Sequence, residues 1–80
     1  MKILIIRLSS IGDIVLTTPV IRCLKKQVPE LELHYLVKAS FKPVLEANPY
    51  IDKLHIYQDE TIEQLKQERF DYVIDLHHNL

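Results

Sequence analysis

The sequence predicts an α/β fold in which short parallel strands alternate with helices around a single sheet. Three observations support this prediction. Apolar runs of strand length recur along the 80 residues, segments with helical spacing of apolar side chains lie between them, and the connections are short. Such alternation is typical of parallel strands joined by right-handed crossovers, with helices on both faces of the sheet.

The first strand is predicted at residues 2–8, an isoleucine-rich run of the kind found in strands buried on both faces. Residues 9–13 interrupt the run, and apolar side chains then recur at helical spacing over 14–28. Pro19 lies inside that helical segment. We therefore expect either a kink near Thr18 or a regular helix that begins at Pro19 with Thr18 as its cap.

The remaining elements follow in the same alternating order. Residues 31–37 and 53–57 have the pattern of the second and third strands, and a short helix is predicted between them over 41–47. Acidic residues followed by an apolar stripe and then basic residues predict a third helix over 59–70. Residues 71–76 provide a fourth strand, which completes a β-α-β-α-β-α-β series.

This series predicts a Rossmann-like unit that includes the whole of residues 1–80. In the usual doubly wound order, 3-2-1-4, the fourth strand lies beside the first and its outer edge is unpaired. An unpaired edge accepts either a further strand or another molecule. A non-enzymatic binding or assembly module that self-associates through this edge is therefore one interpretation of the chain.

The composition is that of an ordinary soluble globular protein. Ten Lys and Arg balance eleven Asp and Glu, a net charge of −1, so nucleic acid is not an expected partner. Cys23 is the single cysteine, which excludes an internal disulfide and suits a reducing compartment, and its apolar helical surroundings predict that it is packed. The N-terminal apolar run is too short for a signal peptide or membrane span, so we expect a cytoplasmic location.

The turn after the first strand is the first place to expect a ligand, because open parallel sheets bind ligands at the carboxyl ends of their strands. Ser9, Ser10, Gly12 and Asp13 lie there, and the chain's single glycine excludes both the three-glycine dinucleotide motif and the two-glycine phosphate loop. The simpler interpretation is structural: Gly12 relaxes a tight turn, and Ser10 or Asp13 caps the helix. The functional alternative is a carboxylate, kept ionised by the helix N-terminus, that accepts a proton from a hydroxyl attacking a sugar carbon.

The segment 2–20, KILIIRLSSIGDIVLTTPV, resembles the opening of glycosyltransferase family 9, the family of the heptosyltransferases. Weaker agreement continues through 41–52 and 71–80. The polar residues and the proline of the first segment fall at the spacing of that family: Arg7, Ser9, Ser10, Gly12, Asp13 and Pro19.

The resemblance implies the GT-B fold, in which two Rossmann-like domains face a cleft. Residues 1–80 would be part of the N-terminal, acceptor-side domain, and the donor-binding domain would be absent from them. The implied activity is inverting transfer of a sugar from a nucleotide-diphosphate donor, ADP-heptose, to a lipid-linked saccharide, the inner core of lipopolysaccharide.

The same resemblance implies that transfer requires no metal or other cofactor. Because the acceptor is lipid-linked, peripheral contact with the inner face of the cytoplasmic membrane is expected. The family binds its nucleotide mainly through residues beyond Leu80, so the 80 residues alone are expected to transfer no sugar.

For the individual residues, the resemblance implies that Asp13 is the general base and that Ser9, Ser10 and Gly12 shape the surroundings of the reacting groups. Capping and catalysis can coexist at Asp13.

Arg7 and Asn79 are the other candidate substrate-binding residues. Arg7 would meet a phosphate or an acidic sugar, but pairing with a carboxylate such as Asp75 is an equally open interpretation. Asn79 follows the last strand at the ligand-binding end of the sheet, where an asparagine also commonly forms a turn.

The histidines and tyrosines predict no site of their own. His77 and His78 would project to opposite faces of a continuing strand, and His34 and His55 lie in different strands without ligand spacing, so no metal site is predicted. The tyrosines are spread over several elements and are predicted to be sheet and edge packing residues rather than a platform for sugar stacking: Tyr35, Tyr50, Tyr57 and Tyr72.

Overall fold

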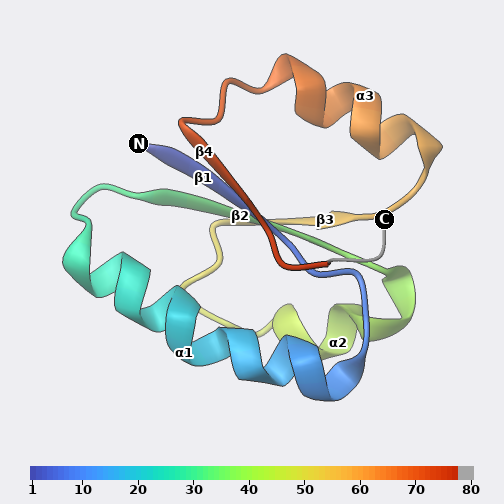
Figure 1. Cartoon of the computed structure of the whole chain (residues 1–80), viewed down its shortest axis with the longest axis horizontal. Coiled ribbons are helices and arrows are strands. Elements are labelled where there is room, and N and C mark those ends of the chain that lie inside the picture. The colour runs from blue at the N-terminus through green and yellow to red at the C-terminus, as the bar shows by residue number, and fades with distance from the viewer. Residues whose placement is uncertain (78–80) are drawn as a thin grey trace.

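The structure, a computed structural model of the 80-residue chain, describes residues 1–77 and confirms the predicted α/β architecture. Four strands form one parallel sheet in the order β3-β2-β1-β4, which is the predicted order. Two helices, α1 and α2, cover one face of the sheet, and α3 covers the other (Figure 1). The fold is therefore three-layered and Rossmann-like.

All predicted elements are present, with bounds that shift by a few residues. The strands are β1 (Lys2–Ile6), β2 (Glu32–Val37), β3 (Lys53–Ile56) and β4 (Tyr72–Asp75). The helices are α1 (Ile11–Gln27), α2 (Lys42–Leu45) and α3 (Asp59–Gln67), and the 3-10 turn η1 (Ala39–Phe41) leads into α2.

The core has two parts of unequal size, one on each face of the sheet. Alternate residues of β1 point to opposite faces, so that Ile3 and Ile5 pack under α1 while Leu4 packs under α3. The cluster under α1 and α2 contains nine buried residues: Ile3, Ile5, Ile14, Ile21, Leu31, Leu33, Tyr35, Val37 and Leu45. The cluster under α3 contains four: Leu4, Leu8, Leu36 and Leu65. The α3 layer is thus held by the smaller apolar core.

Helix α1 runs without interruption through Pro19, so the predicted alternative of a helix that begins at that proline is wrong. A proline has no backbone N–H, which leaves the carbonyl of Val15 without its usual donor. The hydroxyl of Thr18 donates to that carbonyl at 2.8 Å. A side chain one position before the proline therefore replaces the missing hydrogen bond.

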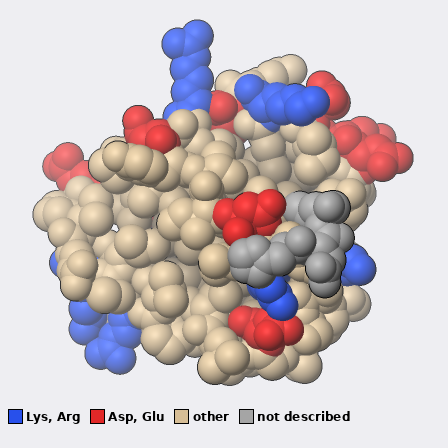
Figure 2. Space-filling model, in the orientation of Figure 1, with Lys and Arg blue, Asp and Glu red and all other residues tan. Residues whose placement is uncertain are grey.

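The outward face of α1 is unexpectedly apolar. A helix that rests on a sheet buries one stripe of its surface, and here the fully buried residues of that stripe are Ile14 and Ile21. Cys23 is exposed, so the prediction that it is packed is wrong. Figure 2 shows an uncharged surface over the middle of α1, with basic side chains toward the far end of that helix. Its exposed apolar residues are Ile11, Val15, Leu16 and Val20.

Among the described residues, no helix combines the length and the apolar character needed to cross a membrane.

Asp52, which directly precedes β3, contacts both β2 and α1 at the amino end of the sheet. Its Oδ2 accepts a hydrogen bond from the backbone N–H of Leu33 in β2 at 2.7 Å and lies 2.7 Å from the Nζ of Lys25 in α1. Burial acts to raise the pKa of Asp52, but these two donors outweigh it and lower the pKa below its ordinary value. Leu33 is fully buried, so its N–H depends on this carboxylate.

Replacing Asp52 by Ala should lower the free energy of unfolding by about 1–3 kcal/mol, because the buried N–H of Leu33 loses its acceptor. Asp52→Asn should cost less, since an amide oxygen still accepts that hydrogen bond. Urea unfolding of the chain followed by circular dichroism measures both. The exposed Glu63 provides a control, and Glu63→Gln should change stability little.

Because the pKa of Asp52 is lowered, the difference in the free energy of unfolding between the wild type and Asp52→Asn should depend on pH. A carboxyl with a folded-state pKa below its unfolded value stabilises the fold above the unfolded value, about 3.9, and loses that contribution as the pH falls through the folded value. The difference between the wild type and Asp52→Asn should therefore shrink below about pH 3.9. A difference that stays constant into strong acid would contradict this account.

Candidate active site

The four parallel strands end at one edge of the sheet, where ligands bind in open α/β folds. Backbone hydrogen bonds join the segments that leave the strands. The N–H of Lys38 donates to the carbonyl of Leu8 at 3.2 Å, and that of Leu76 donates to the carbonyl of Ile6 at 2.9 Å. The segments after β1, β2 and β4 are therefore fixed next to one another, and they frame the start of α1.

Asp13 lies at this edge, in the first turn of α1. Its Oδ2 accepts a hydrogen bond from the hydroxyl of Ser10 at 2.8 Å and a longer one from the backbone N–H of Ser10 at 3.4 Å. The Nη2 of Arg7 lies 2.8 Å from the same oxygen, and the Asp13 side chain is 48% exposed. The carboxylate is thus held in place by its neighbours and still reaches solvent.

Two neighbours keep the carboxyl of Asp13 ionised. The hydrogen bond from Ser10 contributes most and the Arg7 guanidinium next, and together they hold the pKa of Asp13 below its ordinary value. The N-terminal end of α1 favours a negative charge at the same position. The predicted capping role is confirmed in part, because Asp13 reaches back to the residue that precedes the helix.

Arg7 connects the start of α1 to the end of β4. Its Nη1 donates to the carbonyl of Leu76 and its Nη2 pairs with Asp13, whereas its Nε is buried without a partner among the described residues. The alternative pairing with Asp75 is not formed, and Asp75 instead accepts the N–H of His77 at 2.8 Å. The bond to Leu76 therefore holds the guanidinium in place, and the guanidinium in turn orients the carboxylate of Asp13.

The other predicted site residues are placed as follows. Ser9 is half-buried and Ser10 is exposed at the helix start. Gly12 is helical, with no left-handed backbone conformation and open space around its Cα, so the prediction that it relaxes a tight turn is wrong. Its missing side chain leaves the surface beside Asp13 open. Asn79 lies outside the described residues.

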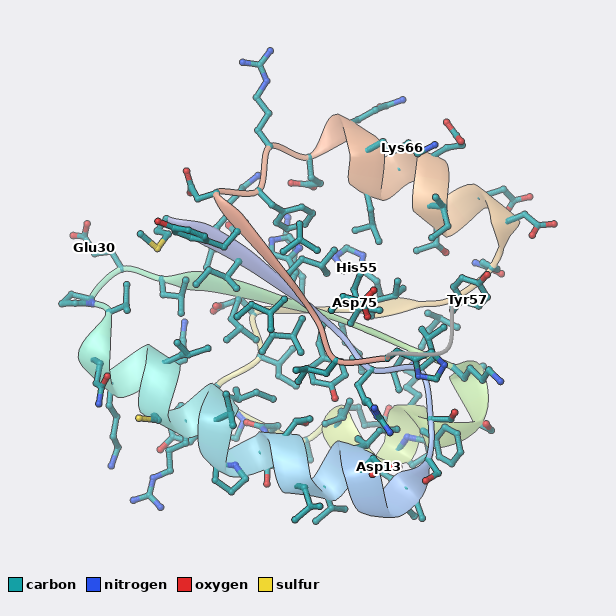
Figure 3. The ribbon with its side chains drawn as sticks, viewed as in Figure 1. Asp13, Glu30, His55, Tyr57, Lys66 and Asp75 are labelled. Carbon is teal, nitrogen blue, oxygen red and sulfur yellow. The ribbon has the colours of Figure 1, made fainter. Side chains whose placement is uncertain are left out.

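The tyrosines differ in how deeply they are buried. Tyr35 is fully buried and shares a 2.9 Å hydrogen bond with Thr17, as a packing residue should. Tyr57 and Tyr72, in contrast, are 45% and 60% exposed, because Tyr57 follows β3 and Tyr72 begins β4, the two outer strands of the sheet. Tyr57 directly follows β3 and so adds an aromatic side chain to the ligand-binding edge (Figure 3). Its position as the last residue of the predicted strand 53–57 is the signal that could have identified it.

A surface groove of about 700 Å³ lies elsewhere, between the second half of α1 and the loop that precedes β3. Pro19, Arg22 and Tyr50 are among its lining residues, and Asp13 is not. This groove is therefore separate from the candidate site around Asp13.

No protein-family model matches the chain. Two curated proteins do. Lipopolysaccharide heptosyltransferase 1 of Campylobacter coli is 44% identical over 55 residues, which are 69% of this chain and 16% of that protein. Lipopolysaccharide heptosyltransferase 3 of Escherichia coli is 30% identical over an alignment that covers 81% of this chain and 23% of that protein. The chain thus spans between about a sixth and a quarter of the length of these relatives.

Solved structures agree with the sequence relatives. The glycosyl transferase family 9 protein from Veillonella parvula DSM 2008 matches with a TM-score of 0.88 and 29% identity, over 98% of this chain and 26% of that one. The E. coli heptosyltransferase WaaC with ADP matches with a TM-score of 0.84 and 22% identity, over 94% of this chain and 27% of that one. The second match shows a shared fold alone. Together with the sequence relatives, the first shows that the chain belongs to glycosyltransferase family 9, the family that includes the lipopolysaccharide heptosyltransferases.

Proposed function

We propose that the chain is part of an inverting glycosyltransferase of the heptosyltransferase type. In this proposal the longer protein moves a sugar from a nucleotide-diphosphate donor, ADP-heptose, to the core of lipopolysaccharide. The relatives, two lipopolysaccharide heptosyltransferases, support the reaction class. The observation that carries the proposal is a half-exposed carboxylate, Asp13, at the ligand-binding edge of the sheet.

The chemistry assigned to Asp13 is general base catalysis. The acceptor hydroxyl donates its proton to a carboxylate oxygen of Asp13 while its own oxygen attacks the anomeric carbon of the sugar. The bond from that carbon to the diphosphate breaks, and the diphosphate leaves with the electron pair. Attack from the face opposite the leaving group inverts the configuration. No step in this scheme requires a metal ion or another cofactor.

The neighbours of Asp13 have opposing effects on such a base. Ser10 and Arg7 fix its orientation, which favours a productive geometry, but they also lower its pKa and so weaken it as a base. An acceptor hydroxyl that displaces one of these partners would restore basicity at the moment of reaction. Ser9 and Ser10 offer hydroxyls to the acceptor, and Gly12 leaves room for it. Asn79, which follows β4 in the sequence, is the remaining candidate for substrate binding.

The proposal places residues 1–80 in the N-terminal, acceptor-side domain of the longer protein. The donor-binding domain would lie outside them, so transfer would require the longer protein. A lipid-linked acceptor would bring this domain to the inner face of the cytoplasmic membrane.

A second candidate function rests on the free edge of the sheet. The outer side of β4 has no neighbouring strand among the described residues, and Tyr72 and Val73 are 60% and 56% exposed there. Such an edge pairs readily with another chain. A non-enzymatic assembly module would use it to dimerise, whereas a longer transferase would cover it with its own next strand.

In the longer protein, Asp13→Asn should reduce the rate of transfer by about 10²–10⁴-fold, because an amide cannot accept the acceptor's proton. Far-UV circular dichroism should be unchanged, since an amide still accepts the hydrogen bond of Ser10. Asp59→Asn is the matched control, because Asp59 is also an acidic residue in the first turn of a helix, α3. Transfer at a near-normal rate in Asp13→Asn would show that Asp13 only caps α1 and is not the general base.

Removing Arg7 should raise the pKa of Asp13 toward its ordinary value, because a cation that stabilises the charged form is lost. The titration of the Asp13 side-chain carboxyl carbon by NMR measures this in Arg7→Met of the 80-residue chain. Arg22→Met, at an exposed position on α1, the helix that carries Asp13, is the control and should leave the midpoint unchanged. An unchanged midpoint in Arg7→Met would show that the ion pair does not control Asp13.

The assembly alternative predicts that the 80-residue chain dimerises and that Val73→Lys dissociates the dimer by placing a charge beside the β4 edge. Val15→Lys is the matched control, because Val15 is a similarly exposed valine on α1. Sedimentation at several dilutions distinguishes the two states. A chain that stays monomeric at every concentration would exclude the alternative.

A further inference from the structure

A second polar cluster lies at the amino end of the sheet, under α3 and away from Asp13. It consists of Glu32 and His34 from β2 and Glu68, which directly follows α3. One potential ligand atom from each of the three lies within 4.8 Å of the other two. The Nε2 of His34 is 2.6 Å from the Oε2 of Glu32. One imidazole and two carboxylates therefore converge from two elements of the fold.

The imidazole of His34 is held rigidly. Its side chain has no exposed surface, and the ring of Phe70 meets it edge-on with centroids 4.9 Å apart. His55 of β3 stacks on it with centroids 5.0 Å apart, and the Nδ1 of His34 is 2.8 Å from the Nε2 of His55. His55 lies between the sheet and α3 (Figure 3).

The sequence analysis treated His34 and His55 as unrelated, because they belong to different strands. The parallel register places Lys53 opposite His34, and His55 follows two residues later on the same face. That register brings the two rings together under α3.

A cation already lies between the two carboxylates. The Nζ of Lys2 is 2.6 Å from Glu68 and 3.8 Å from Glu32. Two ionised carboxylates and a neutral imidazole carry a total charge of −2. The ammonium group of Lys2 balances one of these two negative charges. A divalent ion would balance both. The cluster thus has the negative charge of a metal site, and the ammonium group of Lys2 would compete with a metal ion for the two carboxylates.

The cluster is accessible from solvent. The side chains of Glu32 and Glu68 are 39% and 28% exposed. A polar surface groove of about 470 Å³ adjoins Glu68, and Lys2 and Arg69 are also among its lining residues. An ion can therefore enter from the surface without opening the core, although Arg69 makes the entrance less negative.

We propose that Glu32, His34 and Glu68 form a structural binding site for Zn²⁺, and that Lys2 is the resident cation which the metal displaces. One imidazole nitrogen and two carboxylate oxygens are ligands that zinc accepts, with a water molecule as the fourth. The site would join β2 to the end of α3, on the face with the smaller apolar core. Its place at the amino end of the sheet makes it independent of the transfer reaction.

His55 is the positioning residue of this site. Without metal, the Nε2–H of His34 donates to Glu32, and the Nδ1 of His34 accepts from the Nε2–H of His55. When Zn²⁺ takes the Nε2 of His34, the proton of that ring resides on Nδ1 and donates to His55. His55 then carries its own proton on Nδ1, so the pair keeps two protons. Such a hydrogen bond to the far nitrogen of a ligating histidine is the usual support of a zinc ligand.

The experiment uses the 80-residue chain with His77→Gln and His78→Gln as background, because adjacent histidines bind zinc by themselves. Calorimetric titration with Zn²⁺ should show one equivalent bound. Glu68→Gln should weaken binding at least tenfold, and Lys2→Met should tighten it several-fold by removing the competitor. Glu63→Gln, an exposed glutamate that also pairs with a lysine, is the matched control and should not change it. Mg²⁺ should not compete, since it prefers oxygen ligands and water.

Two further measurements keep the result decisive. Zn²⁺ should raise the thermal midpoint of the background chain and of Lys2→Met, but not that of Glu68→Gln. Nitrogen NMR should show the shift of His34 Nε2 and the change of tautomer at His55. The proposal is overturned if the background chain binds no zinc, if Glu68→Gln binds it equally well, or if Lys2→Met binds it more weakly. Loss of zinc binding in His34→Gln counts only if this variant keeps the native circular dichroism spectrum. If His34→Gln does not fold, the result for Glu68→Gln decides, because Glu68 is only partly buried.

Discussion

The parallel pairing of β1 with both β2 and β4 is the constraint on which the rest of this structure depends. β1 is the second strand from one edge and is buried on both faces, because α1 lies on one side and α3 on the other. Parallel pairing sends every strand in the same direction, so all the loops that follow strands gather at one edge and all those that precede them gather at the other. The molecule therefore has two chemically different ends, one with Asp13 and one with His34.

At the carboxyl end, a single guanidinium links two segments that are far apart in the sequence. Arg7 connects the first turn of α1 with the residue after β4, and it depends on the β1–β4 pairing to do so. If Asp13 acts as the proposed base, this ion pair has a cost, since a base of lowered pKa removes protons less readily. In the proposed reaction, a fixed orientation would offset this cost, because the acceptor must approach the sugar carbon along one line. Figure 2 shows acidic and basic side chains next to one another on this part of the surface.

At the amino end, contacts between polar groups add to the stabilisation that a small apolar core provides. The face under α3 has four buried apolar residues in its cluster, against nine on the opposite face. A fully buried histidine in that layer needs hydrogen-bond partners, because an unpaired buried polar group is costly. Glu32 and His55 are those partners, and the pair of Lys2 with Glu68 connects β1 to the end of α3. The same arrangement provides the charge that a divalent ion requires.

The sequence by itself determined the order of the elements, the strand order of the sheet and the position of Asp13 after β1, because apolar period, turn residues and crossover handedness are local or nearly local properties. The family of the chain was also visible in the residues around Asp13. Only the tertiary structure decided which face of α1 is buried, that Arg7 pairs with Asp13 instead of Asp75, and that His34 meets His55. These outcomes depend on the register between strands and on which surface each helix covers, and both are set by contacts between residues far apart in the chain.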